Sequence, residues 1–123
     1  MKCLLVIAHG SRREASNDEI RELTDRITKK AGASFDLIVP AFLELAEPSI
    51  PDGIKICAEK GATEILIMPY FLSAGRHVAE DIPGEVDSVR DHYPDVNIRI
   101  LPYLGSLEVI PEIMIEQAVS NAS

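Results

Sequence analysis

The chain has 123 residues and a mass of 13.5 kDa, which is enough for one compact domain and too little for two. Hydrophobic residues make up 46% and charged residues 26%, a composition that excludes a disordered or collagen-like chain. The formal charge of −8 argues against a nucleic-acid partner, because phosphate backbones repel an acidic protein.

The first apolar run comprises six residues, from Cys3 to Ala8, and predicts a buried strand. It is far shorter than the roughly 18 apolar residues that suggest a membrane span. Charged residues follow at positions 12–14, where a signal peptide would have a small-residue cleavage site. We therefore expect a cytoplasmic protein with no membrane partner.

Short apolar runs alternate with stretches of helical spacing along the rest of the chain. The further strands predicted are 35–43, 64–68 and 96–101. The helices predicted are 15–31, 50–58 before Gly61, a third around Val86 and Val89, and 107–119. Strand–helix units in series predict one α/β domain over residues 1–123, with a parallel sheet flanked by helices on both faces.

The prolines predict the order of the strands. Pro40 lies within the second strand and Pro102 at the end of the fourth, and proline is tolerated mainly in edge strands or at strand ends. Pro69 is expected to close the third strand. A four-stranded, doubly wound sheet of order 2-1-3-4 fits these positions and right-handed crossovers. Such sheets bind ligands beyond the carboxyl ends of the strands where the order reverses, here between strands one and three.

The two cysteines, Cys3 and Cys57, are far apart in the chain, lie in apolar surroundings and form no CxxC pair. We expect two small buried side chains in a reducing compartment, with a single disulfide as the alternative.

Three chemistry-bearing side chains follow neighbouring strands of this sheet. His9 follows the first strand, Glu44 ends the second, and His77 comes soon after the third. Since adjacent strands lie about 4.8 Å apart, we expect the three side chains to converge within roughly 10 Å. Two imidazoles and a carboxylate suit a borderline divalent ion such as Co²⁺, Ni²⁺, Fe²⁺ or Zn²⁺. The alternative is that they are ordinary solvated loop residues.

Three stretches of the chain carry a family resemblance: Ala8-His9-Gly10-Ser11-Arg12, the run from Ala41 to Ile50, and Pro69-Tyr70-Phe71-Leu72-Ser73-Ala74-Gly75-Arg76-His77 continuing to Pro83. Together, and in this order and separation, they resemble the short sirohydrochlorin chelatases, the small homodimeric form of the class II tetrapyrrole metal chelatases. The resemblance covers essentially the whole chain.

The resemblance implies a lyase that inserts Co²⁺, or else Ni²⁺ or Fe²⁺, into sirohydrochlorin on the way to cobalamin, coenzyme F430 or siroheme. It implies a homodimer of chelatase half-domains and no cofactor beyond the metal substrate. The family's metal-binding histidines map onto His9 and His77, which would also accept pyrrole protons, and its carboxylate ligand maps onto Glu44.

The substrate carries many carboxylates, so local positive charge is expected to face it despite the net charge of −8. Arg12, Arg13 and Arg76 lie on the predicted rim, although Arg13 is equally well read as a solvated loop charge. One of Phe71 and Leu72 is expected in the core. The predicted substrate-binding residues are Ser11, Arg12, Leu72, Ser73, Ala74, Gly75 and Arg76, where Gly75 either binds substrate or supplies an unusual backbone angle.

The sequence is also compatible with other functions. A non-enzymatic metal carrier or sensor would use the same histidines and glutamate without acting on a tetrapyrrole. A flavodoxin-like phosphate binder or receiver-like module would use the same switch point, but the first loop lacks a glycine-rich phosphate cradle. A ferrochelatase that forms heme is the nearest alternative enzyme. The last helix is more apolar than one packed face requires, which points to a contribution to dimerisation.

Overall fold

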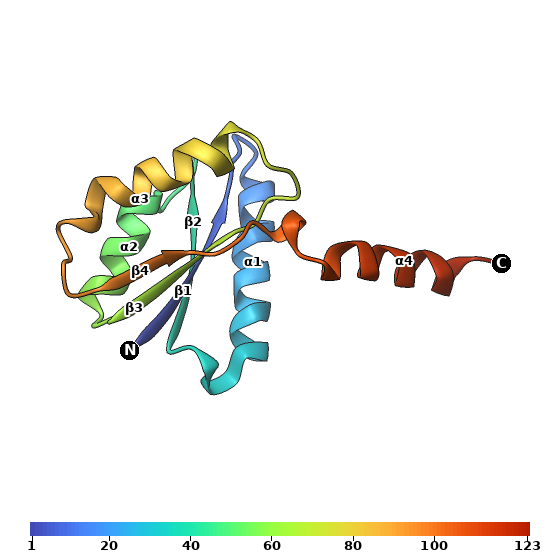
Figure 1. Ribbon diagram of the computed structural model, residues 1–123, viewed down its shortest axis with the longest axis horizontal. Helices are drawn as coiled ribbons and strands as arrows, with labels where there is room; N and C mark the ends of the chain where they lie inside the picture. The colour runs from blue at the N-terminus through green and yellow to red at the C-terminus, as the bar shows by residue number, and fades with distance from the viewer.

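A computed structural model describes residues 1–123 and contains a four-stranded parallel sheet (Figure 1). The strands are β1 (Lys2–Ala8), β2 (Leu37–Phe42), β3 (Glu64–Pro69) and β4 (Asn97–Ile100), and their order in the sheet is β2-β1-β3-β4. The predicted fold class and strand order are therefore confirmed.

Proline positions match their expected places. Pro40 lies in β2, which is an edge strand, so its missing N–H leaves no central ladder position unpaired. Pro69 is the last residue of β3, and Pro102 follows the end of β4.

The two faces of the sheet are covered by different helices. On one face α2 (Ile50–Glu59) and α3 (Ile82–Arg90) bury alternate residues of the strands, while α1 (Glu14–Ala31) lies across the other (Figure 1). The main core consists of thirteen buried side chains between the sheet, α2 and α3. Gly53 of α2 allows close packing there, because an added Cβ would lie 2.9 Å from a methyl carbon of Leu5.

Two short helical segments flank the functional end of the sheet. A π-helical turn, η2 (His77–Asp81), leads directly into α3, and a 3-10 turn, η3 (Leu104–Ser106), follows β4. Neither segment is predicted by the sequence pattern. A third short turn, η1 (Gly32–Ser34), ends α1.

The last helix lies apart from the sheet. α4 (Val109–Asn121) projects away from the rest of the domain (Figure 1). None of its residues is buried, and its main contact is with η3. The sheet is thus flanked by α1, α2 and α3.

The two cysteines are joined. Cys3 of β1 and Cys57 of α2 are both fully buried and form a disulfide, with a Cα–Cα distance of 6.4 Å. The expectation that both side chains are buried is confirmed, and of the two alternatives for their pairing the structure contains the single disulfide. Strand β1 and helix α2 pack face to face, which brings together two residues 54 positions apart.

None of the helices has the length and apolar character needed to cross a membrane.

Candidate functional site

Loops at the carboxyl end of the sheet meet because strand pairing continues past the strands themselves. The backbone N–H of Leu43 donates to the carbonyl of Ala8 at 3.0 Å, and that of Glu44 donates to the carbonyl of His9 at 3.1 Å. These bonds fix the loop after β1 against the loop after β2. The side chains of His9 and Glu44 are therefore neighbours before any ligand is present.

His9 contacts both of the other predicted ligands. Its Nε2–H donates to Oε1 of Glu44 at 3.0 Å. Its ring lies 4.4 Å, centroid to centroid, from the ring of His77, with an interplanar angle of 70°. The side chains of His9 and Glu44 are 46% and 54% exposed, so the cluster is open to an incoming ligand.

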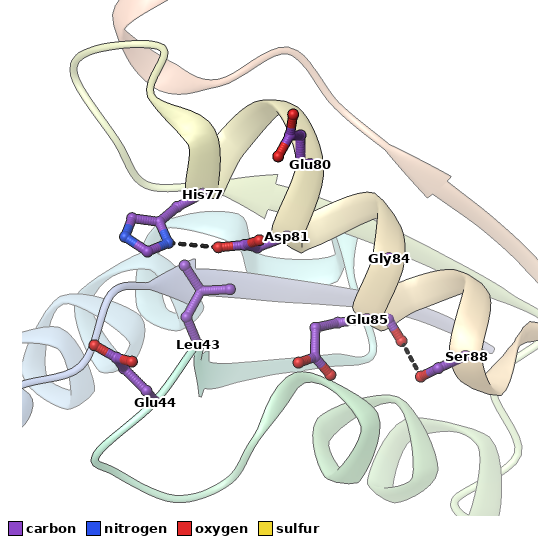
Figure 2. Close-up of a pocket in the computed structure, with 8 residues that line it drawn as sticks. All are labelled: Leu43, Glu44, His77, Glu80, Asp81, Gly84, Glu85 and Ser88. Atoms are coloured by element: carbon purple, nitrogen blue, oxygen red, sulfur yellow. Dashed lines mark hydrogen bonds and ion pairs between the residues drawn. The ribbon is translucent and has the colours of Figure 1, made fainter.

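His77 is oriented by a carboxylate one turn later. Its Nδ1–H donates to Oδ2 of Asp81 at 2.7 Å, a contact drawn in Figure 2. The π-helical turn that begins at His77 brings these two residues together. In the neutral tautomers that donate these two hydrogen bonds, the Nε2 lone pair of His77 and the Nδ1 lone pair of His9 remain free. Two imidazole nitrogens of the cluster are thus available to a cation or a proton.

Gly10 permits the close approach of the two loops. Its φ is +95°, and an added Cβ would lie 1.8 Å from the carbonyl oxygen of Glu44. Any other residue at this position would force the loop carrying His9 away from the loop carrying Glu44. The structural role of this glycine rests on a tertiary contact, so the sequence pattern gave no signal for it.

Asn17 of α1 fixes the loop after β1, which carries His9, through two hydrogen bonds to its backbone. Its side chain is 1% exposed, accepts from the backbone N–H of Ser11 at 2.9 Å and donates to the carbonyl of Ser11 at 2.8 Å. Ser11 Oγ in turn accepts from the backbone N–H of Arg13. Asn17 was not predicted as a site residue, because an asparagine on a helix with many polar residues has no distinguishing pattern.

A pocket of about 470 Å³ lies beside His77 (Figure 2). It lies between the loop after β2 and the segment formed by η2 and α3, and its lining is strongly acidic. The residues around it are Leu43, Glu44, His77, Glu80, Asp81, Gly84, Glu85 and Ser88. No three His, Cys, Asp or Glu side chains surround a common point as a preformed metal centre. In this arrangement Glu44 is hydrogen-bonded to His9 and Asp81 is hydrogen-bonded to His77.

The other predicted binding residues lie on the exposed rim. Those from Leu72 to Arg76 are exposed, and so is Arg12, whereas Ser11 is half-buried. Arg76 Nε lies 3.7 Å from Oε2 of Glu80. These positions place polar and charged groups around the histidine cluster, but none of them contacts it through a hydrogen bond in this structure.

Two finer expectations for the third loop have different outcomes. Phe71 packs against the core while Leu72 is 71% exposed, which confirms that only one of the two is a core residue. Gly75 does not have a positive φ, and a Cβ added to it would meet no atom within 4 Å. The alternative explanation for Gly75, an unusual backbone angle, is therefore wrong.

Arg21 connects helix α1 to the loop that carries Glu44. Its guanidinium donates to Glu14, to Asp18 and to the backbone carbonyl of Glu47, and it lies 5.4 Å from the ring centroid of Phe42. The hydrogen bond from Arg21, assisted by one from Asn17, lowers the pKa of the Glu14 carboxyl. The hydrogen bonds from Arg21 to the carboxylates of Glu14 and Asp18 raise the pKa of Arg21.

Comparison with known proteins identifies a family match over nearly the whole chain. The family model CbiX matches residues 3–121. Among curated relatives, a sirohydrochlorin ferrochelatase of Priestia megaterium is 34% identical over 117 residues, which are 95% of this chain and 43% of the relative. A sirohydrochlorin cobaltochelatase of the same organism is 35% identical over 97 residues, which are 79% of this chain and 31% of the relative.

A solved structure shares the fold. The sirohydrochlorin chelatase SirB of Bacillus subtilis subspecies spizizenii, determined in complex with cobalt, matches with a TM-score of 0.83 and 29% identity. The match covers 98% of this chain and 51% of that chain. This chain therefore spans less than half the length of the two curated relatives and about half that of the solved one.

Proposed function

The chain belongs to the CbiX family, and from that premise we propose that it inserts a divalent metal ion into sirohydrochlorin. We propose Co²⁺ as the metal, with Ni²⁺ or Fe²⁺ as the alternatives. The names of the relatives support a cobalt or iron chelatase. No cofactor beyond the metal substrate is proposed.

The observation that carries the proposal is the convergence of three side chains from separate loops. His9 contacts both Glu44 and His77 at the open end of the sheet, and Glu44 and His77 both line the same pocket. The two cysteines are fully buried in the core and do not contribute to the site. Nitrogen and oxygen ligands hold a borderline cation less tightly than thiolates do. A site without sulfur is therefore suited to releasing a metal ion to a macrocycle.

Metal insertion requires the ion to lose water and two pyrrole N–H groups to lose their protons. The free Nδ1 of His9 and the free Nε2 of His77 are lone-pair donors that replace water on the ion or accept a proton. For each M²⁺ that enters the macrocycle two protons leave, so the charge of the macrocycle complex is unchanged. We propose that the histidines perform both tasks and that Glu44 is the third metal ligand.

The rim is proposed to bind the carboxylates of sirohydrochlorin. Arg12 and Arg76 are exposed around the histidine cluster, and guanidinium groups pair with carboxylates through charge-assisted hydrogen bonds. Backbone and hydroxyl donors at Ser11 and from Leu72 to Gly75 would complete the contact. Sirohydrochlorin would thus lie over the open end of the sheet, with its nitrogens toward the histidines.

We also propose that the chain acts as a homodimer in the cytoplasm. Support for the dimer is helix α4, whose large apolar side chains are exposed and have no packing partner within the chain. A second copy would supply the opposite wall of the cleft by a symmetric contact.

An anaerobic absorbance assay with sirohydrochlorin and Co²⁺, Ni²⁺ or Fe²⁺ tests this function directly. The wild-type chain is expected to change the macrocycle spectrum, and His9→Ala or His77→Ala is expected to abolish that change while the far-UV circular dichroism spectrum stays the same. His92→Ala is the matched control, since His92 is exposed and lies after α3, outside the site.

The outcomes separate the candidate functions. Near-normal insertion by either site variant contradicts the proposed role of the histidines. A wild-type chain that binds Co²⁺ but leaves the sirohydrochlorin spectrum unchanged is instead a metal carrier or sensor. Insertion of iron into a less acidic porphyrin, with none into sirohydrochlorin, indicates a heme-forming enzyme.

A further inference from the structure

Helix α4 is not packed against the sheet or against any other long helix of its own chain. Its large apolar side chains are exposed, among them Met114 at 66%, Ile115 at 64% and Val119 at 69%. They lie on several sides of the helix, and only Glu108, Glu112 and Glu116 form an acidic stripe at four-residue spacing. A helix that is apolar on most sides is normally buried, and a 13-residue helix is marginal on its own in water.

The same chain has an open groove along α1, one end of which reaches His9, Gly10 and Ser11 of the candidate site. Two adjoining pockets, of about 360 and 320 Å³, run along α1 and share Glu19, Ile20 and Tyr70 in their walls. On this face of the sheet Leu66 and Met68 of β3 are only half-buried. Their neighbours Ile65 and Ile67, on the opposite face, are fully buried beneath α2 and α3.

α4 leaves its own domain at an anchored point. The backbone N–H of Gly105 in η3 donates to the carbonyl of Phe71 at 2.9 Å, and an added Cβ at Gly105 would lie 1.8 Å from the carbonyl oxygen of Leu72. The start of α4 is therefore held at the rim of the sheet, and the helix extends outward from there (Figure 1).

We propose that two copies of the chain exchange α4, so that α4 of each copy packs in the groove along α1 of the other. This inference rests on the proposed homodimer and specifies its interface. The chain carries one helix lacking a groove and one groove lacking a helix, which is the self-complementarity that a symmetric contact requires. Exchange buries both surfaces at once.

Unpaired cations support a second copy as the occupant. Arg26, in the wall of the groove, and Arg99, in register with Leu66, have no ion-pair partner in the chain. The acidic stripe of α4 can pair with these two arginines, while Glu19 and Glu22 in the same wall limit this attraction to the positions of the arginines.

Complementation between two defective chains tests the exchange. One chain carries Met114→Glu and Ile115→Glu in α4, and the other carries Leu23→Glu in the groove. Light scattering after gel filtration is expected to give a mass of about 27 kDa for the wild type, twice the 13.5 kDa of one chain, and monomers for each variant alone. A mixture of the two variants is expected to recover dimer, because the heterodimer retains one intact contact between an unmodified α4 and an unmodified groove.

A second groove variant avoids any effect on folding. Arg26 is exposed, so Arg26→Glu leaves the core intact while it repels the acidic stripe of α4. Lys29→Glu, with the same charge change on the same helix but outside the groove, is the matched control and is expected to remain dimeric. Arg26→Glu is expected to raise the dimer dissociation constant at least tenfold relative to Lys29→Glu.

Three results would overturn the exchange. If the wild type is a monomer and the backbone amides of α4 are protected from hydrogen exchange, the helix folds back into its own groove. A second result is that Leu23→Glu folds and dimerises normally, and that Arg26→Glu has the same dimer dissociation constant as Lys29→Glu. In that case α4 packs on a surface other than this groove. Two variants that never complement mean that the contact is not reciprocal. Sirohydrochlorin metallation, measured separately on the wild type, tests the proposed function independently of these results.

Discussion

Gly10 shows how a single hydrogen atom in place of a side chain allows the candidate site to form. Its positive φ and the 1.8 Å separation expected between an added Cβ and the Glu44 carbonyl oxygen are two distinct obstacles to substitution. Gly61 has a similar φ of +101° but no atom within 4 Å of an added Cβ. The pair therefore separates backbone strain from steric clash.

We predict that Gly10→Ala is more destabilising than Gly61→Ala. The second substitution costs only the left-handed conformation, about 1 kcal/mol, whereas the first also displaces the His9 loop from Glu44. Urea unfolding of both variants measures the difference, and the metallation assay should show a large loss for Gly10→Ala alone. Equal unfolding free energies for the two variants would contradict the contact.

Asp81 is expected to act as a positioning residue for His77. Its carboxylate accepts from Nδ1–H at 2.7 Å, which fixes the ring and leaves Nε2 as the free donor atom. We predict that Asp81→Asn lowers metal affinity or insertion rate by about 10- to 100-fold without unfolding the chain. Isothermal titration with Co²⁺ and the absorbance assay measure the two effects.

Asp87→Asn is the matched control for that experiment. Asp87 lies on α3, outside the pocket, and pairs only with Arg90. Its substitution is expected to leave metal binding unchanged. Equal behaviour of the two variants would mean that Asp81 has no role beyond that of an ordinary acidic residue near a helix start.

At the scale of elements, α1 and the loop after β2 are connected through Arg21. This side chain joins Glu14 and Asp18 on its own helix to the carbonyl of Glu47 in the loop. The two elements are distant in sequence, so their connection stabilises the site loop as part of the fold.

The lowered pKa of Glu14 gives this connection a pH dependence. Glu14 stays ionised to lower pH in the folded chain than in the unfolded chain, whose ordinary value is 4.5. Its stabilising contribution is therefore fully present above about pH 4.5 and is lost as the pH falls through the lower folded value. We predict that Glu14→Gln is less stable than the wild type at pH 7 and that this difference shrinks in acid.

Thermal or urea unfolding at pH 7 and at about pH 3 measures that difference. Asp25→Asn serves as the control, because Asp25 is exposed on the same helix and has no ion pair. A stability difference for Glu14→Gln that does not change with pH would contradict the ionic origin of the effect.

At the scale of the whole molecule, the charge of −8 opposes an acidic substrate. The rim arginines attract carboxylates only at short range, while the net charge repels them over a Debye length of about 10 Å at 0.1 M salt. We predict that metal-free sirohydrochlorin associates faster as salt rises from about 10 to 150 mM. Stopped-flow fluorescence measures this rate, and a rate that falls with salt would show that local positive charge dominates the approach.

Arg12→Gln separates the local from the overall charge. This substitution makes the net charge more negative and removes one rim cation, so association should become slower and its increase with salt steeper. Lys60→Gln, on the exposed residue that follows α2, changes the net charge equally without altering the rim. The difference between the association rates of the two variants measures how much the position of Arg12 on the rim contributes beyond its effect on the net charge.

The sequence determined the strand order, the ends of most elements and the three candidate ligands. These depend on local periodicity, on proline chemistry and on the rule that parallel strands end at the same edge, all of which can be read along the chain. The position of His77 after the third strand was enough to place it near His9.

Only the tertiary structure decided what these residues contact. The bond from His77 to Asp81 depends on a π-helical turn, the necessity of Gly10 depends on a loop from another strand, and the Cys3–Cys57 bond depends on how α2 packs against β1. The outward course of α4 is of the same kind. An apolar helix pattern records that a helix must be buried, but the surface that buries it is set by contacts between residues distant in the chain, or in another copy of it.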